Sequence, residues 1–260
     1  MSADAIHVLV SAPVAVVTID RPDVKNAFDD AAAAELVAAF DDLAQRDEVR
    51  VIILEGRGEV FCAGGDLNWM KRVAAYTREE NYEDAGAFQQ AFEAVDSCPK
   101  PVVGRIQGYA LGGGAGLVAC CDIAVAAEGT KLGFPEVRLG LVPGVISPYV
   151  MRKIGPSHTR RLFLTGERFD AAEAMRIGLV HDVVPADELD DAVHAVVGEL
   201  LKCAPQALDG AKQLIRDLLD ADVDKAQMLA RDAITDARAS EDGREGLSAF
   251  LEKRKPGWLG

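Results

Sequence analysis

The stretch from Gly108 to Asp122, GYALGGGAGLVACCD, places three consecutive glycines at the start of an apolar segment. Glycines before a helix let another group approach the main chain closely, and they leave unpaired N–H groups at the positive end of the helix dipole. Such a helix start stabilises negative charge. The alternative is that Gly112 to Gly114 only permit close packing of a strand on a helix, and the spacing alone does not separate the two.

Two common phosphate-binding patterns do not fit this stretch. No Gly-Lys-Ser/Thr follows, as a P-loop requires, and the G-x-G-x-x-G of dinucleotide sites is absent. A second glycine-containing stretch, FCAGGDL at residues 61–67, also follows a buried strand-like run. Two main-chain N–H groups from separate loops are what an oxyanion hole requires, and they would stabilise a thioester carbonyl that gains enolate character.

The elements around these loops indicate an α/β fold. Apolar runs at residues 6–10 and 14–20 predict an N-terminal hairpin, and residues 29–47 and 68–97 carry helical spacing. Further strands are predicted at residues 49–56, 101–108, 122–130 and 131–134. From about Ile146 onward the segments to the C-terminus are predicted to be helical, several of them ending in glycine. The repeated strand–helix order favours a layered core with crossover connections.

Composition excludes several classes of function. The formal net charge is −14 and the sequence pI is about 4.7, so the surface repels nucleic acid and anionic lipid. The five cysteines show no metal-ligand spacing and indicate free or buried thiols in a reducing compartment. No leader or membrane-spanning run is recognised, so we expect a cytoplasmic protein with no membrane or nucleic-acid partner.

Seven stretches, in this order, resemble the enoyl-CoA hydratase/isomerase, or crotonase, family. They are TIDRPDVKNAF (18–28), FCAGGDL (61–67), GYALGGGAGL (108–117), CCDIAVAA (120–127), FPEVRLGLVPG (134–144), LTGERFDAAEAMRIGLVHDVV (164–184) and SAFLEKRKP (248–256). The resemblance implies a spiral of ββα units over residues 1–195 and a helical region over residues 196–260 that builds a trimer or a dimer of trimers. It also implies a coenzyme A thioester as substrate, with no separate cofactor and no metal.

The resemblance assigns roles to particular residues. The N–H groups of Gly65 and Gly113 are the expected oxyanion donors, and Glu136 is the expected acid/base. Hydratases of this family usually carry a second glutamate, but Gly116 stands at its position. Hydration must deliver a hydroxyl to C3 and a proton to C2, whereas moving a double bond needs only one shuttling base. The missing acid by itself therefore favours an isomerase.

Further residues are expected around the substrate. The substrate-binding set implied by the family is Lys25, Ala27, Ala63, Gly65, Asp66, Leu67, Gly112, Gly113, Phe250 and Lys253, and the acyl-pocket set is Trp69, Met70, Gly116 and Pro143. Each has a plainer alternative: Lys25 as a surface lysine, Trp69 and Met70 as core side chains, and the helix of Phe250 and Lys253 as a solvated surface. Phe250 and Lys253 share one helix face and could reach the coenzyme A of a neighbouring subunit.

A finer resemblance points back to hydration. GGGAGLVACCDIA with PEVRLGLVPGVISPYVMRKIG is most similar to bacterial hydratases of branched or carboxylated enoyl-CoAs, of the methylglutaconyl-CoA type. In such a site Glu136 would perform both proton transfers with an ordered water. A single-glutamate enoyl-CoA hydratase is therefore the first hypothesis, a 3-enoyl to 2-enoyl-CoA isomerase the second, and a non-catalytic acyl-CoA-binding subunit the third.

Overall fold

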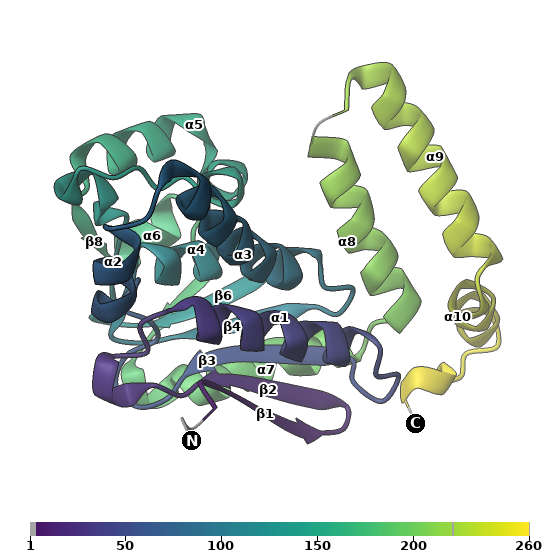
Figure 1. The fold of residues 1–260 in the computed structure, drawn as a ribbon. Coiled ribbons are helices and arrows are strands. Elements are labelled where there is room, and N and C mark those ends of the chain that lie inside the picture. The colour runs from purple at the N-terminus through teal and green to yellow at the C-terminus, as the bar shows by residue number, and fades with distance from the viewer. Residues whose placement is uncertain (1–3, 220, 260) are drawn as a thin grey trace.

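The computed structural model describes residues 4–219 and 221–259, and its centre is a six-stranded sheet in the order β1-β2-β3-β4-β6-β9 (Figure 1). The strands are β1 Ile6–Ser11, β2 Val14–Ile19, β3 Val51–Gly56, β4 Val102–Ile106, β5 Tyr109–Leu111, β6 Ile123–Ala127, β7 Lys131–Gly133, β8 Arg168–Asp170 and β9 Asp182–Val184. The α-helices are α1 Asp30–Ala44, α2 Leu67–Val73, α3 Arg78–Ser97, α4 Gly113–Cys120, α5 Ser147–Thr165, α6 Ala171–Arg176, α7 Leu189–Leu201, α8 Pro205–Leu219, α9 Val223–Ala239 and α10 Glu241–Leu251. All neighbours in this sheet pair in parallel except the β1–β2 hairpin. The predicted hairpin and the predicted α/β class are confirmed.

A second, three-stranded sheet, β5-β7-β8, makes the fold a spiral. The chain passes from β4 in the large sheet to β5 in the small one and then enters α4, and the next turn repeats this order with β6, β7 and α5. Isolated bridges from Cys62 to Ala110 and from Phe28 to Gly65 continue the small sheet toward the N-terminus. Successive turns therefore stack, and the loops that follow each strand meet at one edge.

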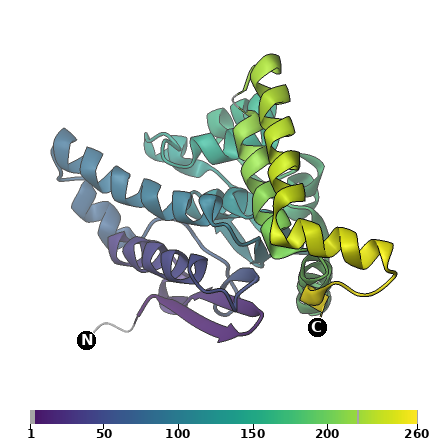
Figure 2. The same cartoon turned by 90° about the vertical axis from the view of Figure 1, so that its right-hand side faces the viewer.

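Alternating side chains of the large sheet pack in two hydrophobic cores, one on each face of the sheet. Ile52 and Leu54 of β3 belong to the larger core, on the face covered by α1, α3 and α4, whereas Val51 and Ile53 face α7. In Figure 2, α1 (dark purple) and α3 (blue) lie side by side on that first face. Both faces of the central strands β3, β4 and β6 are covered, which explains why these strands are almost continuously apolar rather than alternating apolar and polar.

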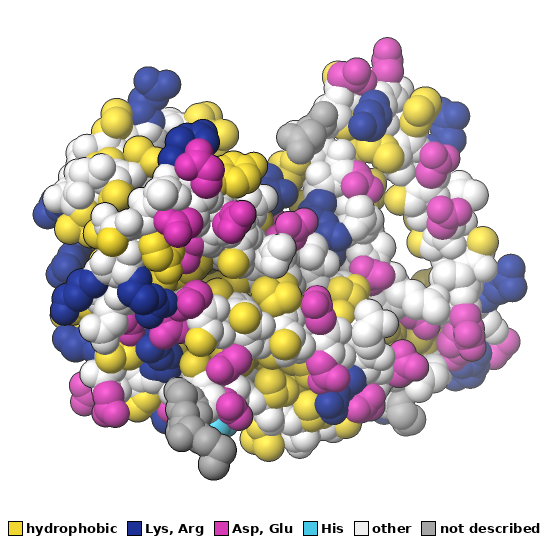
Figure 3. All heavy atoms as spheres, in the orientation of Figure 1, with side chains coloured by type: hydrophobic (Ala, Val, Ile, Leu, Met, Phe, Trp, Pro, Cys, Tyr) yellow, Lys and Arg dark blue, Asp and Glu magenta, His cyan; other side chains and the backbone are white. Residues whose placement is uncertain are grey.

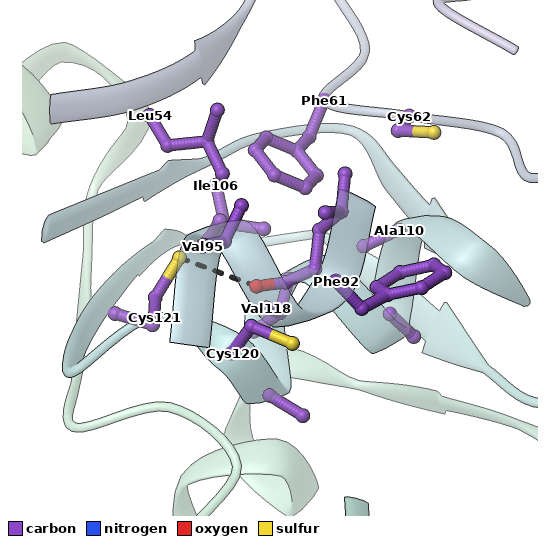
Figure 4. Packing of buried hydrophobic residues seen from close by; sticks show 14 of the residues in the cluster. Leu54, Phe61, Cys62, Phe92, Val95, Ile106, Ala110, Val118, Cys120 and Cys121 are labelled. Atoms are coloured by element: carbon purple, nitrogen blue, oxygen red, sulfur yellow. Dashed lines mark hydrogen bonds between the residues drawn. The ribbon is translucent and has the colours of Figure 1, made fainter. Parts of the chain in front are cut away.

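The helix α4 runs through the middle of the larger core. All its residues after Gly113 are buried, and Figure 4 shows its Val118 and Cys120 with Phe92 and Val95 of α3 around it. Four of the five cysteines are buried and Cys203 is exposed, and none forms a disulfide. Among the helices that the structure describes, none has both the length and the hydrophobicity that crossing a membrane requires.

The segments expected to be helical after Ile146 are helices, but the short strands β8 and β9 that lie between them were not predicted, and β9 completes the large sheet. The strand β5 was not predicted either, because the predicted strand at residues 101–108 ends just before it. Each of these strands has three residues, which is too short for a period-two pattern to show, and they form because β6 and β7 offer unpaired edges. The helix α5 is kinked at Gly155, which has non-helical backbone angles and precedes Pro156.

The helices α8, α9 and α10, here called the arm, stand apart from the rest of the molecule (Figures 1 and 2). The helix α7 still packs on the sheet, so the arm begins after it, and the predicted boundary at residue 195 falls inside α7. Figure 3 shows a notch between arm and body, and apolar side chains on the arm's surface. Those more than half exposed include Ile215, Met228, Leu247, Phe250 and Leu251.

Candidate active site

The loop of residues 61–67 lies directly against the start of α4. The N–H of Leu111 donates to the carbonyl of Cys62 at 3.1 Å, and the N–H of Cys62 donates to the carbonyl of Tyr109 at 3.0 Å. A Cβ on Gly64 would lie 2.9 Å from the carbonyl oxygen of Leu111, and one on Gly114 would lie 2.9 Å from Cβ of Cys62. The two glycine stretches can therefore meet only because both positions lack a side chain.

The N–H of Gly65 is left free by its bridge to Phe28. The N–H of Phe28 donates to the carbonyl of Gly64 and the N–H of Asp66 donates to the carbonyl of Phe28, both at 2.7 Å. In this parallel bridge the residue between the two bonds, Gly65, directs its own N–H to the other side. Gly113 is the first residue of α4, where backbone N–H groups have no partner within the helix. Two N–H donors from touching loops thus remain available for a carbonyl oxygen.

Glu136 brings a carboxyl group to the same place. It lies in a short 3-10 helix, Pro135–Leu139, and its Oε1 is 3.1 Å from where a Cβ of Gly112 would stand. Its Oε2 is buried and has no hydrogen-bond partner among the described residues. Burial raises the pKa of this carboxyl, and the hydrogen bond to its own backbone N–H offsets only part of the rise. A carboxyl group with a raised pKa and an unused oxygen is suited to moving a proton.

Comparison with known proteins shows which family the chain resembles. The enoyl-CoA hydratase/isomerase family matches residues 10–260. A crotonyl-CoA hydratase of Syntrophomonas wolfei is 34% identical, with 94% of each chain covered, and a 2,3-dehydroadipyl-CoA hydratase of Escherichia coli is 33% identical, with 95% of each covered. The chain belongs to the enoyl-CoA hydratase/isomerase family. The crystal structure of an enoyl-CoA hydratase from Shewanella pealeana, 37% identical, superimposes with a TM-score of 0.94 and covers 98% of this chain and 96% of that one.

Two of the expected acyl-pocket residues of this family member lie against the loop of residues 61–67. Trp69 and Met70 of α2 stand over Gly65, because a Cβ there would lie 3.0 Å from the Trp69 ring and 2.9 Å from the Met70 methyl group. The Trp69 ring also packs on Phe88, and its Nε1 donates to Asp84 at 3.1 Å. Pro143 is buried in the loop before α5. Gly116 is buried in α4, in contact with the side chain of Ile146.

Asp66 has a clear structural task. It is almost fully buried, its Oδ1 accepts the N–H groups of Asn68 and Trp69 at the start of α2, and its Oδ2 lies 3.1 Å from the Arg21 guanidinium. Burial favours a higher pKa for this carboxyl, but the two N–H groups and Arg21 together lower it below its usual value. Both oxygens are occupied, so Asp66 fixes the loop beside Gly65, while its neighbour Leu67 is exposed.

The loop of Lys25 and Ala27 is held in place by residues that the sequence did not single out. Asn26 is fully buried, its side chain donates to the carbonyls of Arg57 and Val60, and it accepts the N–H of Arg21. The N–H of Ala63 donates to the carbonyl of Lys25 at 3.0 Å, while the lysine side chain is exposed. This loop therefore lines the outer edge of the site next to Ala63.

Phe250 and Lys253 do not reach this site within one chain. They lie on or just after α10, at the end of the arm remote from α2 in Figure 1, and the Phe250 side chain is 80% exposed. Any contact of theirs with a substrate has to be made in another subunit. Within the described residues no three His, Cys, Asp or Glu side chains gather as a metal site.

Four residues near the site were missed by the sequence analysis: Arg21, Asn26, Phe92 and Ile146. Arg21 and Asn26 stood in a quoted motif, but no pattern showed that they are buried anchors. Phe92 and Ile146 come from α3 and from the residue before α5, and only packing brings them to α4. Phe92 lies inside a long helix and Ile146 in the turn before one, so no local signal marks them.

Proposed function

We propose that the protein adds water to a 2-enoyl-CoA thioester, with Glu136 as its only acid/base and the N–H groups of Gly65 and Gly113 as the oxyanion donors. Water gives a proton to the Glu136 carboxylate and its oxygen bonds to C3. The electron pair of the C2–C3 double bond moves toward the thioester oxygen, where the two N–H groups stabilise the enolate. Glu136 then returns the proton to C2, so one carboxyl group completes the addition.

The observation that carries this proposal is the carboxyl group of Glu136 beside the start of α4. Its Oε1 is next to Gly112, its Oε2 is unpartnered, and its pKa is raised by burial. A structural carboxylate in this position would be expected to use its oxygens in hydrogen bonds, as Asp66 does. The Glu136 carboxyl group is instead left available for a substrate or water.

For the acyl group we propose the branched or carboxylated class, of the methylglutaconyl-CoA type. The Escherichia coli relative is named for a carboxylated enoyl-CoA, 2,3-dehydroadipyl-CoA. Trp69, which lies against Gly65 and is only partly buried, is aromatic and would offer an apolar surface to the carbons next to the thioester. The sequence resemblance and this relative support the proposal. Preferential hydration of 3-methylglutaconyl-CoA over crotonyl-CoA tests it.

An isomerase is the second candidate, and the observation that favours it is Gly116. A 3-enoyl-CoA is converted to a 2-enoyl-CoA by taking a proton from C2 and returning one to C4, which a single carboxyl group can do. The same oxyanion donors would stabilise the dienolate between the two steps. A chain that binds acyl-CoA without reaction is the third candidate.

We also propose that the arm assembles the protein as a homotrimer or a dimer of trimers. Its exposed apolar side chains, among them Phe250, Leu251 and Met228, need covering. Assembly would also allow Phe250 and Lys253 to meet the coenzyme A bound by a neighbouring subunit, with Lys25, Ala27 and Ala63 of that subunit lining the rest of the site.

The deciding experiment incubates the protein in heavy water with crotonyl-CoA, 3-methylglutaconyl-CoA or a 3-enoyl-CoA, with products identified by mass. We expect hydrated, deuterated product from a conjugated substrate. In Glu136→Gln, kcat should fall about 10²–10⁴-fold while acyl-CoA binding is kept. Glu128→Gln, which changes an exposed carboxylate at the end of β6, is the matched control and should retain full activity.

The other outcomes assign the alternatives. Reaction of the 3-enoyl-CoA alone, with its double bond shifted, would establish the isomerase. Binding of all three thioesters without any reaction would leave a non-catalytic subunit. Full hydration by Glu136→Gln would contradict the role given to this residue.

A further inference from the structure

The position where the family usually carries its second glutamate has no room for a side chain. A Cβ on Gly116 would lie 2.9 Å from Cβ of Ile146, closer still to its Cγ2, and 3.1 Å from Cε1 of Phe92. Ile146 and Phe92 are each 3% exposed, so neither can turn aside into solvent. Ile146 is also β-branched, which leaves it little rotational freedom. The space that an acid at position 116 would enter is therefore filled by hydrocarbon.

This filled space adjoins the reacting groups. Residues 113 and 116 are one helical turn apart on α4, and the Phe92 ring contacts both positions, with its Cζ 3.6 Å from a Cβ placed on Gly113. Gly112, at the preceding position, faces Glu136. Figure 4 shows Phe92 beside α4, and its ring packs on Tyr149 with centroids 6.2 Å apart. Ile146 therefore packs one helical turn from Gly113, the proposed oxyanion donor on α4.

We propose that Ile146, backed by Phe92, is the residue that restricts this site to one acid. This inference rests on the proposed hydratase. Ile146 closes the place from which a second carboxylate could act, so water can be activated only by Glu136. Gly116 and Ile146 then form a coupled pair: an acid at position 116 is compatible with the fold, and can take part in catalysis, only after the side chain at position 146 has been shortened.

The test is a double-mutant cycle of Gly116→Glu, Ile146→Ala and their combination, with crotonyl-CoA hydration, Tm and the pH profile of kcat/KM measured for each. Gly116→Glu alone should lower Tm and reduce kcat/KM more than tenfold. In the combined variant, Tm should return to within a few degrees of Ile146→Ala and kcat/KM should rise at least tenfold above Gly116→Glu. Its pH profile should show a second ionisation beside the single one of the parent protein.

Val145 supplies the matched control, because it is adjacent to Ile146, half-buried and packed on the same core. Val145→Ala combined with Gly116→Glu should rescue neither Tm nor activity. The proposal is overturned if Gly116→Glu alone is as stable and active as the parent, if Val145→Ala rescues as well as Ile146→Ala, or if the combined variant keeps a single ionisation. A parent protein that folds but hydrates neither crotonyl-CoA nor 3-methylglutaconyl-CoA would instead refute the proposed function, while the Tm values still test the coupling.

Discussion

At the scale of single residues, Glu136 and Asp66 show how position decides the task of a carboxyl group. Asp66 is buried with both oxygens engaged, and its pKa is lowered. Glu136 is half-buried with one oxygen unpartnered, and its pKa is raised. The first carboxylate is stabilised in its charged form and supports the loop beside Gly65. The second is kept closer to its neutral form and can exchange a proton with a ligand.

The raised pKa of Glu136 predicts a pH-dependent cost in stability. The folded state binds the Glu136 proton more tightly than the unfolded state does. The stability gained from this proton is therefore fully present below the ordinary carboxyl pKa and is lost as the pH rises through the folded pKa. Glu136→Gln should therefore have a higher Tm than the parent protein, and the difference should grow from acid to neutral pH. Thermal unfolding followed by circular dichroism at a series of pH values measures it.

Glu173→Gln is a control of opposite sign. Arg176 and then Arg161 lower the pKa of Glu173 to about 2, so its contribution is present above the ordinary carboxyl pKa and is lost on acidification. This variant should have a lower Tm than the parent at neutral pH, with the difference shrinking toward pH 2. A Glu136→Gln protein that behaved in the same direction would contradict the raised pKa of Glu136.

At the scale of elements, α2 depends on its first turn. It has no fully buried residue, and its attachments include the Asp66 cap, the packing of Trp69 on Phe88 with its hydrogen bond to Asp84, and ion pairing of Arg72 with Asp30. Trp69 and Met70 nevertheless stand over Gly65. The start of α2 therefore helps to position Gly65, one of the two proposed oxyanion donors.

We expect Asp66→Ala to lower the free energy of unfolding by about 1–3 kcal/mol, through loss of the cap and of a charged partner for Arg21. It should also lower kcat for hydration, because the N–H of Gly65 is no longer held in place. Asp170→Ala is the matched change, since Asp170 caps α6 by accepting the N–H of Glu173 at 2.9 Å and is exposed. Urea unfolding and steady-state kinetics compare them; equal losses of kcat would rule out a specific role for the α2 cap.

At the scale of the whole molecule, basic side chains fasten the arm to the body, among them Lys212 and Arg216 of α8 and Arg50 of the body. The Lys212 ammonium of α8 lies 2.7 Å from Oδ2 of Asp122, which also accepts the N–H of Val102 at 2.8 Å. Arg50, just before β3, donates to the carbonyls of Leu201, Cys203 and Trp258. Arg50 thereby holds both the segment between α7 and α8, where the arm begins, and the segment after α10, where the chain returns to the body.

We expect Lys212→Met to loosen the arm without unfolding the core. Amide hydrogen exchange should rise in α8, α9 and α10 and stay unchanged in β3 and β4, and the sedimenting mass of the proposed trimer or dimer of trimers should fall. Lys202→Met is the control, because the Lys202 side chain is 63% exposed and pairs only with the exposed Glu199. Unchanged exchange in the arm of Lys212→Met would show that the Asp122 contact does not position it.

The sequence by itself determined the family, the α/β class, the N-terminal hairpin and the longer strands and helices, and it predicted that the glycine loops and Glu136 form the site. These depend on local patterns: apolar period, glycine before a helix, and an ordered series of motifs. Tertiary structure alone decided the three-residue strands β5, β8 and β9 and the ion pair between the buried Asp66 and Arg21. It also decided the packing of the Ile146 side chain on Gly116 and the distance of Phe250 and Lys253 from the site of their own chain. Each of these depends on contacts between residues far apart in the sequence, and such contacts are set by how the elements pack rather than by local preference.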